Sequence, residues 1–349
     1  MAQINKPNLY FNTVLYTGDG TTNQTKNITF GFQPDWSWFK SRDAGNSHVL
    51  VDAVRGGDKM ITSESTNAEI TLTATQLFTS TGMTISNDAS QANSINSSGS
   101  TKVCWGWLGA NGTASNTDGS ITSTVSANTT SGFSIVSYTG TGSAATIGHG
   151  LGSAPAFYII KQRNTTGGWI VYHKGNTSSP ETDYLRLDKT DITVDDAIFN
   201  DTAPTSSVFS IGTNAPVNTS GGTYIAYCFA EKKGFSKAFS YTGNGSADGS
   251  FCYLGFKPAF IICRDPNNLE NWFMFDNKRP GYNVNANLLY ANDAANETTS
   301  GANQIDLLSN GFKMRATNNG MNRSGATFIG FAFAESPLVG TNDTPATAR

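Results

Sequence analysis

Three copies of one twelve-residue pattern constrain the fold of this chain more than any other feature. Each copy begins with Asn, has Ser-Gly at its third and fourth positions, and continues as a run in which large and small residues alternate. The copies cover residues 96–107, 218–229 and 322–333. Period-two alternation places the large residues on one face of a β-strand, and the small residues between them indicate that the other face is crowded too. This pattern is typical of a central strand in a two-layer β-sandwich.

Further markers recur in the same order and with nearly the same spacing. Tyr-Thr-Gly begins at Tyr16, Tyr138 and Tyr241, and the Asn of the first pattern follows 80, 80 and 81 residues later. Between these markers, each copy has a Pro-initiated apolar strand and then a second apolar strand, at residues 36–39 and 49–52, 157–160 and 169–173, and 260–263 and 272–276. A repeat of about 100 residues suits an independent β-sandwich domain and is too long for a solenoid unit.

The repeat predicts an all-β protein of three tandem antiparallel β-sandwich modules. The predicted segments are an N-terminal arm (1–8), module 1 (9–110), a linker or extra hairpin (111–130), module 2 (131–234), module 3 (235–336) and a C-terminal tail (337–349). Ser, Thr and Asn are abundant throughout, and these residues compete with the hydrogen bonds of a helix.

The charge and the distribution of apolar residues exclude several classes of function. Charged residues make up only 14% of the chain and the formal net charge is −3, so the basic face that a nucleic-acid-binding protein needs is not expected. The first residues are polar, which predicts no secretory signal. No apolar run approaches the ~20 residues that would span a membrane, so membrane insertion is not expected.

The acidic residues do not suggest an enzyme. Asp52 and Asp276 stand at equivalent strand ends, but His173 occupies that position in the second copy. A catalytic carboxylate pair that was repeated with the modules would keep its acids. Alternatively, these acids are paired with nearby Lys or Arg or with strand-end amides. We therefore expect no enzymatic activity.

No cofactor is expected either. The three histidines are scattered, and the four cysteines form no CxxC pair, so we interpret the cysteines as small buried residues. Carboxylates in loops could supply oxygen ligands for Ca²⁺, although no stretch has the spacing of an EF-hand loop. The candidates are Asp183, Asp188, Asp191, Asp195 and Asp196.

Sugar binding is the ligand chemistry that the sequence favours. Trp169 and Trp272 occupy equivalent positions after polar turns, and an aromatic ring can cover the apolar face of a sugar. Asp276, His173 and Arg264 lie at neighbouring strand ends and could hold hydroxyl groups. Alternatively, the tryptophans belong to the core, because they lie in alternating apolar runs.

Four of the motifs together resemble an uncharacterised tandem-repeat domain family of marine tailed-bacteriophage virion and tail-fibre proteins. The matching residues are 241–245 (Tyr-Thr-Gly-Asn-Gly), 255–258 (Gly-Phe-Lys-Pro), 218–229 and 333–337 (Phe-Ala-Glu-Ser-Pro). The resemblance covers about residues 9–337. It implies a virion protein with jelly-roll or lectin-like sandwiches, and it carries over no catalytic residue.

Two functions are consistent with this resemblance. The first is a tail-fibre or receptor-binding adhesin that contacts host-surface polysaccharide, where repetition of a weak site would raise avidity. The second is a capsid-decoration or tail-connector protein that binds only other virion proteins. Both place the protein in the virion after synthesis in the host cytoplasm. The resemblance also raises the expectation of a homotrimer, since trimers are common among phage fibres.

Overall fold

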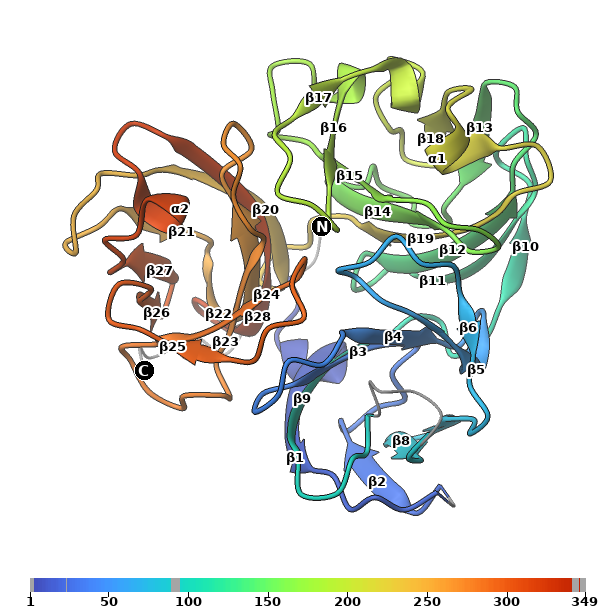
Figure 1. Ribbon diagram of the computed structural model, residues 1–349. Coiled ribbons are helices and arrows are strands. Elements are labelled where there is room, and N and C mark those ends of the chain that lie inside the picture. The colour runs from blue at the N-terminus through green and yellow to red at the C-terminus, as the bar shows by residue number, and fades with distance from the viewer. Residues whose placement is uncertain (1–2, 23, 89–94, 341–344, 346–349) are drawn as a thin grey trace.

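The computed structural model describes residues 3–22, 24–88, 95–340 and 345, and over this range the chain is nearly all β-structure (Figure 1). Its paired strands form antiparallel sheets, which group into three lobes around a common centre (Figure 1). We call these groups lobe 1 (residues 11–107), lobe 2 (residues 114–229) and lobe 3 (residues 236–337).

Lobe 1 has a large and a small sheet. The large sheet runs in the order β1 (Phe11–Thr17), β9 (Thr101–Trp107), β3 (Trp36–Ser41), β4 (Val49–Asp52), β5 (Gly56–Ile61) and β6 (Ile70–Thr71). The small sheet contains β2 (Lys26–Thr29), β8 (Gly82–Ile85) and β7 (Leu77–Thr79).

Lobe 2 repeats this order and adds a hairpin at one edge. Its large sheet runs β10 (Ala114–Asn116), β11 (Ser123–Asn128), β12 (Phe133–Thr139), β19 (Thr223–Phe229), β14 (Phe157–Gln162), β15 (Trp169–His173), β16 (Asp183–Arg186) and β17 (Val194–Asp195). The small sheet pairs β13 (Ala145–Gly148) with β18 (Val208–Ile211). Of the two possibilities for residues 111–130, the structure therefore has a hairpin.

Lobe 3 shows the same order without the hairpin. Its large sheet runs β20 (Ser236–Thr242), β28 (Thr327–Pro337), β22 (Phe256–Arg264), β23 (Phe273–Asp276), β24 (Asn287–Tyr290) and β25 (Thr298–Thr299). The small sheet contains β21 (Phe251–Tyr253), β27 (Gly311–Met314) and β26 (Ile305–Leu308). Pro258 lies at an irregularity inside β22 rather than at the start of a strand.

The alternating runs form β9, β19 and β28, which are inner strands of the large sheets. Their large residues do not face the small sheet of their own lobe. Trp105, Tyr227 and Phe331 instead belong to one core shared by all three lobes, where Trp36 stacks on Tyr227 with ring centroids 4.3 Å apart. The small residues on the opposite face contribute to three separate cores, each between the large and small sheet of one lobe. The large sheets are thus buried on both faces.

Short helices occur between the strands. Among the described residues they are η1 (Pro7–Leu9), η2 (Pro180–Thr182), η3 (Ala197–Phe199), α1 (Ala215–Asn218) and α2 (Asn319–Asn322). The described part of the predicted N-terminal arm contacts the segment between lobes 2 and 3: Ile4 is buried, and its N–H donates to the carbonyl of Lys233 at 3.1 Å. Most of the predicted C-terminal tail lies outside the described residues.

The repeated Asn explains why the first sequence pattern recurs with the Tyr-Thr-Gly turn. Asn218 is fully buried, its Oδ1 accepts from the N–H of Thr141 at 2.8 Å, and its Nδ2 donates to the carbonyls of Ser143 and Gly212, both at 2.7 Å. Asn96 and Asn322 likewise accept from a turn N–H, of Asp19 and Asn244, and donate to a turn carbonyl, of Thr21 and Ser246. One amide side chain therefore satisfies backbone groups that the turn would otherwise bury unpaired.

Candidate functional site

The five residues predicted to contact a glycan lie inside the molecule. Trp169, Trp272, Asp276 and Arg264 have no exposed surface, and His173 is 2% exposed. All five lie where one lobe meets another, as the contacts below show. A glycan cannot reach them in this structure, so the prediction of sugar contacts does not fit their positions. The alternative interpretation, that the tryptophans belong to the core, agrees with their burial.

Trp169 and Trp272 are equivalent, as the repeat indicates, and each contacts the preceding lobe. The indole Nε1 of Trp169 in lobe 2 donates to the carbonyl of Thr62 in lobe 1 at 2.9 Å. The indole Nε1 of Trp272 in lobe 3 donates to the carbonyl of Arg186 in lobe 2 at 2.8 Å. A buried indole N–H usually finds a hydrogen-bond partner, and in both cases that partner belongs to the adjacent lobe.

His48 takes the equivalent position in lobe 1. Its Nδ1 accepts from Trp38 Nε1 at 2.8 Å, so the ring proton is on Nε2, which donates to the carbonyl of Tyr290 in lobe 3 at 2.8 Å. Burial lowers the pKa of His48 to about 3, and the imidazole is therefore neutral near pH 7. The same contact between lobes is thus made by indole in two lobes and by imidazole in the third.

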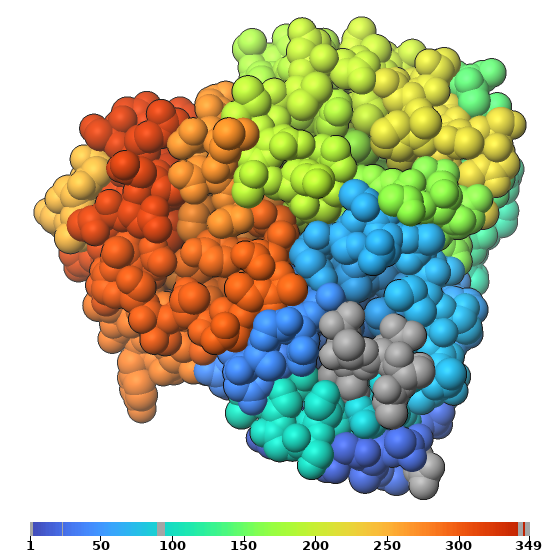
Figure 2. All heavy atoms as spheres, in the orientation of Figure 1, coloured from blue at the N-terminus to red at the C-terminus, as the bar shows by residue number. Residues whose placement is uncertain are grey.

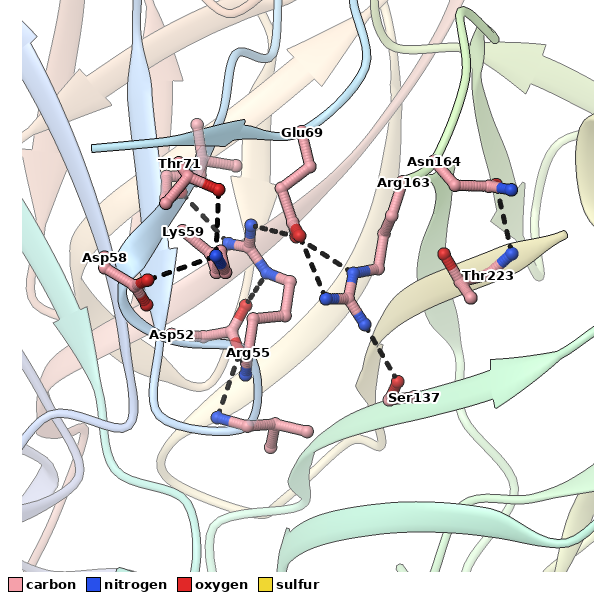
Figure 3. Close-up of polar contacts among 12 residues, drawn as sticks. Asp52, Arg55, Asp58, Lys59, Glu69, Thr71, Ser137, Arg163, Asn164 and Thr223 are labelled. Atoms are coloured by element: carbon pink, nitrogen blue, oxygen red, sulfur yellow. Dashed lines mark hydrogen bonds and ion pairs between the residues drawn. The ribbon is translucent and has the colours of Figure 1, made fainter. Parts of the chain in front are cut away.

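Asp52 ends β4 beside Arg55 (Figure 3), and its buried carboxylate is a hydrogen-bonding centre between lobes 1 and 2. Its carboxylate accepts from the N–H groups of Val54 and Arg55 and from Arg55 Nε at 2.5 Å. Tyr227 of lobe 2 donates its hydroxyl to the same carboxylate at 2.7 Å. The side chains of Asp52 and Arg55 are both fully buried. A charge in this position is tolerated only because every oxygen is paired.

Asp276 repeats this centre between lobes 3 and 1. Its carboxylate accepts from Arg279 Nε at 2.6 Å and from the indole Nε1 of Trp105 in lobe 1 at 3.1 Å. Trp105 and Tyr227 are the middle large residues of their alternating runs, so the two carboxylates meet equivalent positions of the neighbouring lobe. The possibility that these acids pair with nearby Arg and strand-end amides is what the structure shows.

His173 occupies the same place between lobes 2 and 3, and the residue opposite it differs. The middle large residue of β28 is Phe331, which has no hydrogen-bond donor to offer a carboxylate. The His173 Nε2 instead lies 2.9 Å from the carbonyl of Gly330, and its Nδ1 accepts from the N–H of Gly175 at 3.0 Å. Burial lowers the pKa of His173 to about 4. A neutral imidazole therefore replaces the carboxylate where the neighbouring lobe lacks a donor.

A second polar contact accompanies each buried Asp. Glu69 in lobe 1 pairs with Arg55 of its own lobe at 3.2 Å and with Arg163 of lobe 2 at 2.9 Å (Figure 3). Glu297 in lobe 3 pairs in the same way with Arg279 at 3.0 Å and with Arg42 of lobe 1 at 2.9 Å. Although burial opposes ionisation, the hydrogen bond from Arg42 holds the pKa of Glu297 below its ordinary value.

Among the described residues, the contact between lobes 2 and 3 shows no ion pair at the equivalent positions. Thr193 stands where Glu69 and Glu297 do, because its N–H donates to the carbonyl of Pro266 just as Glu69 N–H donates to Arg163. The Thr193 hydroxyl donates to Asn176 at 2.8 Å. Two contacts between lobes are therefore charged, and the third uses only neutral side chains at these positions.

The cations at the ends of the first apolar strands also join the lobes. Lys40, Lys161 and Arg264 are buried, and burial lowers their pKa to about 8, about 8 and about 10. Each donates to a backbone carbonyl of a neighbouring lobe: Lys40 Nζ to Ala294 at 2.9 Å, Lys161 Nζ to Thr66 at 3.1 Å, and Arg264 Nη2 to Asp191 at 2.6 Å. Arg264 also lies 5.3 Å from the ring centroid of Trp272.

The predicted calcium ligands are engaged in other contacts where the structure gives them partners. Asp188 pairs with Arg186 at 3.0 Å, Asp183 accepts from Thr177, and Asp196 accepts from Asn214. Within the described ranges no group of three or more His, Cys, Asp and Glu side chains is placed to hold a metal ion. The four cysteines are buried and unbridged, and no helix of the described chain is long and apolar enough to cross a membrane.

The fold and these contacts define an all-β protein whose repeated polar side chains hold its own lobes together. The family of the Domain of unknown function (DUF7483) matches residues 6–337, and the chain belongs to this family. No curated protein and no solved structure matches the chain.

Proposed function

We propose that this protein is a structural component of a bacteriophage virion that binds other virion proteins through its outer surface. The resemblance of residues 9–337 to virion and tail-fibre domains supports the location. The observation that carries the structural role is the burial of Trp169, Trp272, Asp276, His173 and Arg264 between lobes. These are the side chains that a repeated receptor site would have to expose.

The way the lobes are joined supports a structural role. Hydrophobic side chains from all three large sheets form one core, and on the face shown in Figure 2 the atoms of the three lobes abut. Each lobe also donates a buried cation and a ring N–H to a neighbour. A molecule held in this way presents its outer loops and strands at fixed positions, which suits repeated assembly with other proteins.

The finer architecture belongs to the same proposal. We interpret the three lobes as copies of one antiparallel β-sandwich module of jelly-roll or lectin-like type. The recurring strand order and the recurring Asn, Tyr-Thr-Gly turn and ring N–H contacts support this interpretation. We further propose that the protein has no enzymatic activity.

Localisation on intact particles tests the virion proposal. Cryo-electron microscopy of purified virions would place the protein and define its neighbours. Density for this fold on the capsid surface, or between other virion proteins, would support the decoration or connector role. Absence of the protein from purified, intact particles would contradict the proposal.

The adhesin remains a second candidate, on a different observation. Tyr282 lies on the surface of lobe 3 and is 81% exposed, and Leu269 of the same lobe is 68% exposed. An exposed aromatic ring can stack on the apolar face of a sugar. Glycan-array binding that is lost with Tyr282→Ala and kept with Leu77→Ala, an exposed residue of lobe 1, would favour this role.

Oligomeric state, including the expected homotrimer, is measured by light scattering on the purified chain.

A further inference from the structure

Lobe 3 has an open groove along one side of its two sheets. The groove is lined by residues 237–242 of β20 and residues 250–253 of β21 with its flank. In the described structure β20 pairs with β28 on one side; on the other side Ser236, its first residue, is bridged by the backbone of Lys232, and no named strand lies beside the rest of β20. Phe251 and Tyr253 of β21 are 45% and 54% exposed here. We call this feature the β20–β21 groove.

Lobe 2 has the same side covered by its own chain. The strand β11 pairs antiparallel with β12, the equivalent of β20, with Ser126 opposite Ile135 and Thr124 opposite Ser137. The hairpin also reaches the small sheet, because Ser123 Oγ donates to the carbonyl of Gly148 in β13 at 2.7 Å. This segment therefore closes the side of the sandwich that lobe 3 leaves open.

In the part of the chain that the structure describes, β1 of lobe 1 also has no strand beside it on this side, and the equivalent positions of lobe 1 are polar. Ile28, Ile147 and Cys252 occupy equivalent positions in the small sheets. Each pairs with an apolar residue of the neighbouring strand, which is β8, β18 or β27. The residues on either side of Ile28 are the exposed Asn27 and Thr29. Of the three equivalent edges, the one in lobe 3 therefore carries large exposed aromatic residues at these positions. Exposed apolar surfaces of this kind mark interaction sites.

Two side chains hydrogen-bond to backbone groups on the free edge of β20, where an adjacent strand would otherwise pair. Ala238 and Ser240 correspond to Ile135 and Ser137, which pair with β11 in lobe 2. The N–H of Ala238 donates to Glu231 Oε1 at 3.0 Å, and the carbonyl of Ser240 accepts from Cys252 Sγ at 3.7 Å. The polar atoms of β20 thus point into the groove, and an added strand would take over these contacts.

The charge around the start of β20 is positive. Lys232, Lys233 and Lys237 line or flank the groove, which continues here toward Gln3. Glu231 is the acid among these residues, and it is already paired with Lys174 of lobe 2 at 2.5 Å. Farther along, Asp248 is paired with Lys313 at 2.5 Å. An occupant with carboxylates at the end near the lysines would complement this charge.

We propose that the β20–β21 groove binds an extended, acidic segment of a partner protein. The segment adds to β20 as an antiparallel strand, as β11 does to β12, and its side chains cover Phe251 and Tyr253. Main-chain hydrogen bonds supply affinity in this mode, and the side-chain contacts supply specificity. The inference rests on the comparison of three edges within one chain and stands independently of the virion proposal.

A peptide that copies the occupant of lobe 2 tests the groove. The probe is a fluorescent peptide with the sequence of residues 121–128 followed by two glutamates, because the C-terminal end of β11 lies beside the start of β12. Fluorescence anisotropy with the purified full-length chain measures its affinity. We expect saturable binding of this peptide. Replacing its two glutamates with lysines should weaken the binding about tenfold, which is a modest part of the binding free energy of a micromolar complex.

The matched variant gives β21 the residues of lobe 1. Phe251→Asn with Tyr253→Thr reproduces the polar pair Asn27 and Thr29, so the sheet should fold, and circular dichroism and thermal unfolding check that it does. We expect this variant to lose at least about tenfold in affinity. Tyr282→Asn, which removes an exposed ring elsewhere in lobe 3, should bind as the natural chain does.

Three results would overturn the proposal. One is no binding of the peptide, and the second is equal binding by the folded double variant. The third is self-association of the chain that light scattering detects and the double variant abolishes, because the occupant would then be a second copy. Binding that the double variant and the lysine peptide both weaken supports an acidic partner strand.

Discussion

The hydroxyl of Tyr227 donates to the buried carboxylate of Asp52 across the contact between lobes 1 and 2, at 2.7 Å. The equivalent pair between lobes 3 and 1 is Trp105 with Asp276, and the donor is again present. Between lobes 2 and 3 the donor is missing at Phe331, and His173 replaces the acid. The strand-end residue is thus an acid in the two contacts where the middle large residue of the neighbouring strand is a donor, and a histidine in the contact where that residue is Phe331.

Removing the Tyr227 hydroxyl should cost more than removing a hydroxyl bonded to a neutral group. Tyr227→Phe leaves a buried carboxylate short of one donor, and we expect unfolding free energy to fall by about 2 kcal/mol. Tyr138→Phe is the control, because that buried hydroxyl donates to the carbonyl of Val217 at 2.9 Å and should cost about 1 kcal/mol. Urea unfolding measures both. Equal losses would argue against a charged acceptor at Asp52.

Exchanging the residues of the third contact tests the pairing directly. His173→Asp places a carboxylate opposite Phe331, where the neighbouring side chain offers no donor, and we expect a loss of about 3 kcal/mol. Phe331→Tyr added to this variant recreates the Asp52–Tyr227 arrangement and should recover part of the loss. The coupling between the two changes is obtained from a double-mutant cycle in urea. A second change that deepens the loss would count against the pairing rule.

The Glu69–Arg163 ion pair should contribute a measurable coupling between lobes 1 and 2. Arg163 contacts Glu69 through two nitrogens at 2.9 and 3.0 Å, and both side chains are mostly buried. We expect a coupling energy of about 1 kcal/mol from the cycle of Glu69→Gln and Arg163→Gln. The coupling should shrink as salt is raised from 0.05 to about 0.5 M. A coupling energy near zero at low salt would mean that this ion pair does not stabilise the contact between lobes 1 and 2.

Acid should destabilise the protein through its buried histidines. The pKa of His48 is lowered to about 3 and that of His173 to about 4 by burial, whereas the unfolded chain has a histidine pKa of about 6.5. The unfolded state therefore binds more protons between about pH 4 and 6.5, and stability falls as pH is lowered through this window. Each histidine contributes about 1.4 kcal/mol per pH unit.

The contribution of one histidine can be isolated. His173→Gln removes a titrating group and keeps an amide that can donate to Gly330. Its stability should change less steeply with pH between about 6.5 and 4 than that of the natural chain, by about 1.4 kcal/mol per unit. Urea unfolding at several pH values gives the slopes. Identical slopes would mean that His173 is not held neutral in the fold.

The repeated Asn should be as important to each lobe as its contacts indicate. Asn218→Ala leaves the N–H of Thr141 and the carbonyls of Ser143 and Gly212 without this partner in a buried site, and we expect a loss of about 3 kcal/mol. The same change at Asn322 should have a similar cost. Thermal and urea unfolding measure both. Losses below about 0.5 kcal/mol, typical of exposed positions, would contradict the role.

The sequence predicted the strands well where a repeat marker preceded them. Residues 49–52 and 169–173 were expected as strands and are β4 and β15, and both faces of the alternating runs were expected to be crowded. Periodicity identifies which side chains share a face, but it does not say what that face meets. Alternation alone does not place the large residues of β9, β19 and β28 in the core between the lobes, where the structure has them.

The same limit explains the glycan residues. Trp169 and Trp272 were singled out because they are equivalent and aromatic, and these properties also describe contacts between repeats. Arg55 and Arg279 were missed, although both stand three residues after a strand-end Asp, and this shared spacing was the available signal. From the sequence, the replacement of Asp by His173 argues only against a repeated catalytic acid. Phe331, which stands where the neighbouring lobes have a donor, lies more than 150 residues away, and the fold alone brings its strand next to His173.

Calorimetry of the whole chain tests most directly whether the three lobes form one structural unit. The shared core and the buried ion pairs between lobes predict a single unfolding transition, with a calorimetric enthalpy equal to the van't Hoff enthalpy. Tyr227→Phe should shift this transition as a whole to lower temperature. Separate transitions for the lobes, or a shift confined to part of the unfolding curve, would contradict the account.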